Sequence, residues 1–99
     1  MKKIGKMVHH IEDEMKSAKC YAELFIENKA DGNIELANQF RNMAQAEIDH
    51  TNFWHQLSVN LIEKVRKVYK PSAEMQSKWD DVHKKYIEEM AEIERMLSM

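Results

Sequence analysis

The chain has little of what sheet proteins and disulfide-rich proteins depend on. Its 99 residues include two glycines, one proline and one cysteine. So few turn-forming residues are hard to reconcile with a sheet, whose strands are joined by tight turns. The single cysteine, Cys20, excludes an internal disulfide framework and any Cys-x-x-Cys site within the chain. This use of cysteine fits a reducing cytoplasm, where we expect Cys20 to be a small, at least half-buried filler.

Long apolar runs and basic runs are also missing. No stretch approaches the run of about 18 apolar residues that a membrane span needs. Met1-Lys2-Lys3 is not followed by the unbroken apolar segment of a signal peptide. The 15 basic and 17 acidic residues form no basic tail or patch that stands out in the sequence. We therefore expect a cytoplasmic protein that binds neither membranes nor nucleic acids.

The residues that are abundant, Glu, Lys, Met, Ala and Leu, favour helices. The apolar spacing predicts one all-α helical domain over residues 1–99, with helices at about 3–30, 34–69 and 73–98. Gly32 can adopt the left-handed conformation that ends the first helix, which makes a tight antiparallel hairpin. Pro71 ends the second helix, and Ser72 can cap the third.

The second predicted helix is longer than the first. At about 1.5 Å per residue the second helix is about 54 Å long and the first about 40 Å. The second helix must therefore extend past the first or bend near residues 58–60. Three helices with one apolar stripe each can form a small bundle, but four helices enclose a ligand-holding core more completely. Dimerisation would supply the missing helices.

Glu47-x-x-His50 interrupts the apolar stripe of the second helix. One turn places this carboxylate and imidazole on the same face, and we expect both to point inward. Burying a neutral polar group without a partner costs on the order of 2–7 kcal/mol, and a charge costs more. A bound cation would compensate. The stripe around the pair consists of Phe40, Met43, Ala44, Trp54, Leu57, Leu61 and Val65.

A third metal-ligating residue lies on the first helix. In an antiparallel hairpin, residues equally distant from the turn lie side by side. With the turn at residue 32, Glu14 lies level with His50, on the inward side of the first helix. Two carboxylates and one imidazole favour Fe²⁺ or Mn²⁺, because structural zinc usually recruits cysteines. Iron is the preferred metal, with manganese and zinc as alternatives.

These residues are half of the set that a di-iron bundle uses, which is four carboxylates and two histidines. Two chains related by a twofold axis would complete it. The third helix offers other ligands, because reflection about residue 71 brings Glu92 level with His50 and Glu89 level with Phe53.

The stretch from residue 14 to residue 50 resembles the metal-binding half of rubrerythrin and its ferritin-like relatives. The positions that carry the likeness are Glu14, Tyr21 seven residues later, the Asp31-Gly32 turn, Ala37, Phe40, Ala44 and Glu47-x-x-His50. The resemblance implies that Glu14 and His50 are terminal ligands and that Glu47 bridges two metals. It also implies that Tyr21 lies just outside the ligands.

Two family features are absent from the chain: a second Glu plus Glu-x-x-His set and a cysteine-bound iron. The shorter pattern is similar to encapsulated ferritins, whose half-length chains dimerise into a four-helix bundle and oxidise ferrous iron at the interface. The resemblance thus implies a di-iron ferroxidase that uses oxygen or peroxide, with Glu14, Glu47 and His50 as its catalytic residues.

Two other interpretations remain open. The same three residues could bind metal without turnover, or make interfacial hydrogen bonds in a non-catalytic helical interaction module. His10 precedes Glu14 by one turn and is either its hydrogen-bonding partner or an exposed residue near a frayed end. We expect His55 and the Asp80-x-x-His83 pair to lie on the surface.

Overall fold

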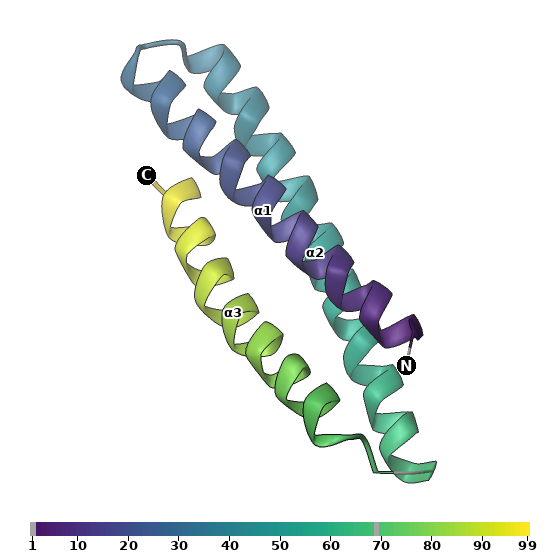
Figure 1. Cartoon of the computed structure of the whole chain (residues 1–99). Helices are drawn as coiled ribbons and strands as arrows, with labels where there is room; N and C mark the ends of the chain where they lie inside the picture. Colours follow the sequence, from purple (N-terminus) through teal and green to yellow (C-terminus); the bar gives the residue numbers. More distant parts are fainter. Residues whose placement is uncertain (1, 69) are drawn as a thin grey trace.

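The computed structural model describes residues 2–68 and 70–99. Within them the chain forms α1 (Lys2–Ala30), α2 (Ile34–Val68) and α3 (Ala73–Leu97), with no strand (Figure 1). The all-α prediction is confirmed, and the helix ends lie within one residue of those expected. Residue 69, predicted in the second helix, lies outside the described residues. No helix in the described part of the chain is long and apolar enough to cross a membrane.

α1 and α2 form the predicted antiparallel hairpin. Gly32 has a φ of +79°, in the left-handed region that only glycine adopts without strain. The turn is closed by hydrogen bonds from the Gly32 N–H to the Lys29 carbonyl and from the Asn33 N–H to the Asn28 carbonyl. With 35 residues against 29, α2 extends past the N-terminal end of α1 (Figure 1).

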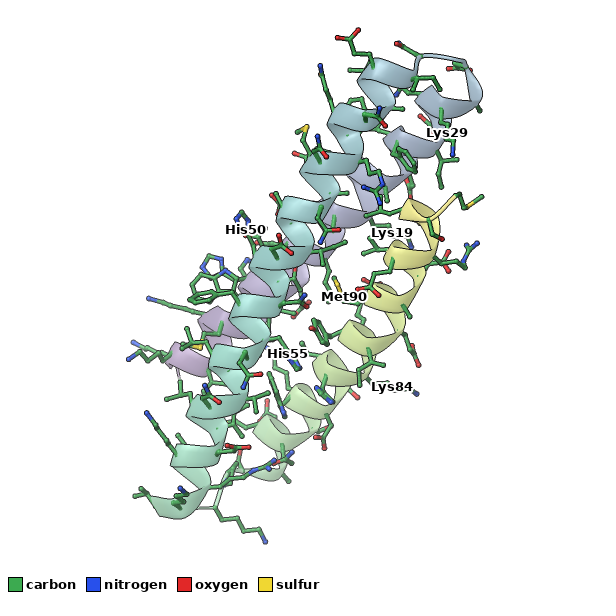
Figure 2. The ribbon with its side chains drawn as sticks, turned by 180° about the vertical axis from the view of Figure 1, so that it is seen from behind. Lys19, Lys29, His50, His55, Lys84 and Met90 are labelled. Carbon is green, nitrogen blue, oxygen red and sulfur yellow. The ribbon has the colours of Figure 1, made fainter. Side chains whose placement is uncertain are left out.

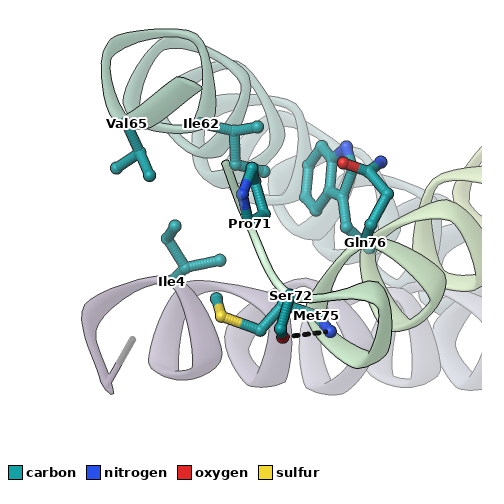
Figure 3. A pocket seen from close by; sticks show the side chains of 8 residues that line it. Ile4, Ile62, Val65, Pro71, Ser72, Met75 and Gln76 are labelled. Atoms are coloured by element: carbon teal, nitrogen blue, oxygen red, sulfur yellow. Dashed lines mark hydrogen bonds between the residues drawn. The ribbon is translucent and has the colours of Figure 1, made fainter. Parts of the chain in front are cut away.

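α3 returns along the hairpin and packs mainly against α1, to which it runs parallel (Figure 1). Its N-terminus is capped as predicted, because the Ser72 hydroxyl accepts a hydrogen bond from the Met75 N–H at 3.2 Å. Pro71 and Ser72, together with Ile4 and Ile62, border an apolar cavity of about 50 Å³ (Figure 3). The three helices make a rod whose Cα atoms span 55 × 17 × 17 Å.

The buried residues of α1 recur every three or four positions, the helical spacing on which the sequence prediction rested. Tyr21 is half-buried. Full burial of a large apolar side chain such as Ile11, Met15 or Ile93 contributes about 1.5–3 kcal/mol. Cys20, expected in or near the core, is exposed. The buried residues of α1 are Ile4, Met7, Val8, Ile11, Met15, Ala18, Ala22 and Phe25.

The stripe predicted on the second helix is partly wrong. Met43 and His50 are exposed, and Val68, the last residue of α2, is 79% exposed. The residues that α2 buries are Ala37, Ala44, Ile48, Thr51, Ser58, Ile62 and Val65.

Two polar residues explain part of this error. The hydroxyls of Thr51 and Ser58 donate to the carbonyls of Glu47 and Trp54 one turn earlier, at 2.7 and 2.8 Å. Both side chains thereby satisfy their polar groups within α2 and can be buried at little cost. A pattern built on apolar residues alone does not include them.

Candidate metal centre

The hairpin brings Glu14, Glu47 and His50 together near its middle. Glu47 and His50 lie one turn apart on α2, and Glu14 faces them from α1. The Nδ1 atom of His50 lies 3.7 Å from Oε2 of Glu14 and 4.0 Å from Oε1 of Glu47. One donor atom from each residue lies within 4.8 Å of the other two.

This group lies on the surface of the single chain and not in its core. The side chains of Glu14 and Glu47 are each 22% exposed, whereas that of His50 is 59% exposed. Figure 2 shows His50 on the side of α2 away from α3, while His55 lies on the side that faces α3. The expectation that both polar groups of α2 point into the core is therefore wrong for one chain.

The donor set suits a divalent cation. Two ionised carboxylates side by side repel each other, and a cation between them reverses that interaction. Donor atoms that share one cation, each about 2.0–2.2 Å from it, lie at most about 4.4 Å apart. Side-chain movements of less than about an ångström would bring the three donors within that range. Carboxylate oxygen and imidazole nitrogen are ligands for iron, manganese and zinc.

Two other predicted participants, Tyr21 and His10, contact aromatic rings of α2. Tyr21 is half-buried and its ring packs against that of Phe40, with centroids 6.5 Å apart. Among the described residues no hydrogen bond or ion pair joins His10 to Glu14, and the His10 ring stacks on Trp54 with centroids 4.5 Å apart and an interplanar angle of 6°.

The two acidic residues of α3 do not join the group within one chain. Both carboxylate oxygens of Glu92 accept hydrogen bonds from Arg95, and these bonds lower the pKa of Glu92. Glu89 borders a different groove, between α1 and α3. α3 packs on the opposite side of the hairpin from His50 (Figure 2).

The metal-ligating group lies at the centre of a surface that we call the open face. On each helix its residues are spaced alternately three and four apart, the spacing by which helices pack side by side. All are half-buried or exposed. The open face consists of His10, Glu14, Ser17, Tyr21, Leu24 and Asn28 on α1, and Leu36, Phe40, Met43, Glu47, His50, Trp54, Leu57 and Leu61 on α2.

A second cluster of polar rings lies between α2 and α3, where surface residues were expected. His55 stacks on Tyr86 with centroids 3.9 Å apart, and its Nε2 lies 2.9 Å from Nδ1 of His83. Burial, followed by the charge on His83, lowers the pKa of His55. Asp80 accepts from Gln76 and is not paired with His83.

One signal in the sequence could have located His55. It lies one turn after Thr51 and two turns after Ile48, both of which are buried. The sequence prediction did not place His55 on this buried face of α2, because polar Thr51 was not predicted to be a core residue.

The rubrerythrin family model matches residues 8–97, which include the metal-ligating group and most of all three helices. No curated protein and no solved structure matches the chain significantly.

Proposed function

Because the chain belongs to the rubrerythrin family, whose members typically bind iron, we propose that Glu14, Glu47 and His50 form an iron site. The observation that carries this proposal is the approach of three donor atoms to within 4.8 Å from two helices. Their two carboxylates are the charged, half-buried groups that a divalent cation would neutralise.

The site is completed by a second copy of the chain packed on the open face. Ferritin-like di-iron sites use a Glu from each of two helices and a Glu-x-x-His from each of two others, and one chain supplies half of these. An isologous twofold contact would place the same half-site against itself. Two observations support this arrangement: the open face has helix-packing spacing, and its apolar residues include Met43, which is 42% exposed.

Such a site would act as a ferroxidase, with ferrous iron as the substrate. Each Fe²⁺ that becomes Fe³⁺ releases one electron, so two irons reduce one O₂ to hydrogen peroxide with uptake of two protons. The iron supplies the redox chemistry. The protein's share is ligation by Glu14, Glu47 and His50, with the carboxylates balancing the charge gained on oxidation. The apolar residues of the open face would exclude water from around the two irons.

Anaerobic titration with Fe²⁺, followed by exposure to air, tests this function. The proposal predicts saturation at about one iron per chain and then a rise in ferric absorbance. Binding without the rise would mean that the protein holds iron but does not oxidise it. Absence of binding by an intact oligomer would favour the non-catalytic interaction module.

A further inference from the structure

Polar and aromatic side chains join α2 to α3 near the middle of α3. α3 packs mainly against α1, and His55 lies on the side of α2 that faces α3 (Figure 2). The His55 ring stacks face to face on that of Tyr86, with centroids 3.9 Å apart and an interplanar angle of 6°. The Tyr86 hydroxyl in turn donates a hydrogen bond to the side-chain oxygen of Asn52 on α2. Side chains from both helices therefore interlock at this level.

The ring nitrogens of His55 and His83 face each other edge to edge. Nε2 of His55 lies 2.9 Å from Nδ1 of His83, whereas the ring centroids are 5.1 Å apart and the planes differ by 17°. A neutral imidazole donates from one ring nitrogen and accepts at the other. Two neutral imidazoles in this arrangement share one N–H between them, and this hydrogen bond joins α2 to α3.

The imidazole pair can accept one added proton without losing its hydrogen bond, but not two. A first proton can bind at an outer nitrogen, and the charged ring still donates its inner N–H to the neutral partner, which strengthens the bond. A second proton has to bind at the inner nitrogen that accepts this bond. Two N–H groups then face each other without an acceptor, and two like charges at hydrogen-bond distance repel.

Neighbouring contacts limit how His55 can relieve that repulsion. If its ring turned away from His83, it would lose its stack on Tyr86, and a movement of Tyr86 would break the hydrogen bond to Asn52. Both imidazoles are half-buried. Burial, followed by the charge on His83, lowers the pKa of His55, so the second proton binds only below the ordinary histidine pKa of about 6.5.

The other ionisable groups of α3 near the pair do not take part in its hydrogen bond. The Asp80 carboxylate accepts a hydrogen bond from Gln76, and Lys84 points away from α2 (Figure 2). Burial, followed by the negative charge of Glu94, raises the pKa of Tyr86, so its phenol stays neutral at the pH at which histidines titrate.

The faces that α2 and α1 turn toward the interior carry no further charge near the pair. The α2 residues one turn from His55 are uncharged: Thr51, Asn52, Ser58 and Val59. The residues that α1 buries are all apolar. The charged residues of α1 at this end, His9, Glu12, Asp13 and Lys16, border a groove together with Lys85 and Glu89.

We propose that the His55–His83 pair is a pH-sensitive latch between α2 and α3. The latch holds the two helices together while the pair carries at most one added proton, and it opens when the pair binds a second. Opening separates the middle of α3 from α2 but leaves the apolar contact of α3 with α1, so the helices stay folded. This inference does not depend on the proposed metal function, because neither histidine belongs to the open face.

The unmodified chain, labelled with ¹⁵N, provides the test as the pH is lowered from about 8 to about 5, above the range in which ordinary carboxylates titrate. NMR shifts of the ring nitrogens report the protons bound by each imidazole. The coupling between the two facing nitrogens reports the hydrogen bond, and the nuclear Overhauser effect between His55 and Tyr86 reports the stack. Both signals should be lost as the second proton binds, while circular dichroism shows intact helices.

Three results would overturn the latch. They are persistence of both signals in a doubly protonated pair, unfolding of the helices before the second proton binds, and failure to bind that proton by about pH 5.

His83→Gln tests the cause of the opening. The glutamine amide can donate to neutral His55 and accept from charged His55, but it does not titrate. This variant should therefore keep the nuclear Overhauser effect between His55 and Tyr86 over the whole pH range. His9→Gln, the same change at an exposed histidine of α1, should lose it as the unmodified chain does. Loss of the signal in His83→Gln at the same pH would show that repulsion between the two imidazoles does not open the contact.

Discussion

Glu47 is the proposed ligand that lies one turn from His50 on α2 and faces Glu14 on α1. Replacing it with alanine removes a carboxylate that the resemblance implies is shared by two metals, so Glu47→Ala should abolish iron binding. The helices should remain, since alanine favours helix and the loss of one of two neighbouring charges relieves repulsion. Iron stoichiometry and circular dichroism measure these two effects.

Asp49→Ala is the matched control for this variant. Asp49 is an exposed acidic residue on the same helix, and its carboxylate contacts Gln45 and not the metal-ligating group. The Asp49→Ala variant should bind as much iron as the unmodified chain. If Glu47→Ala retains full iron stoichiometry, the site lies elsewhere.

The lowered pKa of His55 makes stability depend on pH. The unfolded chain binds protons near the ordinary histidine pKa of about 6.5, whereas folded His55 binds them only at lower pH. The free energy of unfolding should therefore fall as the pH drops below about 6.5, and this decline should end below the lowered pKa. His55→Phe keeps a ring against Tyr86 but cannot titrate, so its decline should be shallower.

Urea unfolding between about pH 7 and pH 5 measures that slope. Below about pH 5 ordinary carboxylates begin to contribute as well. His9→Phe changes an exposed histidine and serves as the comparison. A decline in His55→Phe as steep as in the unmodified chain would show that His55 does not cause it.

At the residue scale, the sequence predicts those positions that depend only on local chain geometry. The level of Glu14 with His50 follows from a hairpin whose turn position Gly32 reveals, and the spacing of Glu47 and His50 follows from the helical repeat. The contact of His55 with His83 depends on which side of the hairpin α3 packs against. No local pattern specifies that side.

The ends of the helices were predictable because Gly32, Pro71 and Ser72 each act through local backbone chemistry. Gly32 and Gly5 allow a matched test of this reasoning. Gly32→Ala places a Cβ in a left-handed conformation and should destabilise the chain by about 1–2 kcal/mol. Gly5→Ala adds a Cβ in open space on α1 and should stabilise it by about 0.5–1 kcal/mol.

Denaturant midpoints of both variants measure these changes. Opposite signs are the expected result. Destabilisation by Gly5→Ala would mean that the N-terminal turn of α1 packs differently from the structure described here.

α2 was harder to interpret because it carries two neighbouring rows of helix-packing positions. One row faces α1 and α3 and includes Ile48 and Ile62, and the other belongs to the open face and includes Leu57. Sequence alone does not say which row a third helix covers. The mixed stripe predicted for this helix combined residues of both rows.

At the scale of the whole molecule, an uncovered row on each helix of the hairpin is the reason to expect dimers. Met43→Lys places a charge in the middle of the open face and should give monomers, because burying an unpaired ammonium is costly. Ile87→Lys changes an exposed apolar residue of α3 outside the open face and should leave dimers intact. Sedimentation equilibrium of the two variants measures the difference, and dimers of equal affinity in both would place the interface on another surface.

In the proposed site, two copies of the chain each contribute Glu14, Glu47 and His50. Native mass spectrometry of the protein loaded anaerobically with Fe²⁺ tests this sharing, since mass reports subunits and bound iron together. We expect a dimer that carries about two irons, and an iron-free species when Glu47 is replaced by alanine. A monomer that retains iron, or a dimer whose iron content is unaffected by that replacement, would rule out a site shared by two copies.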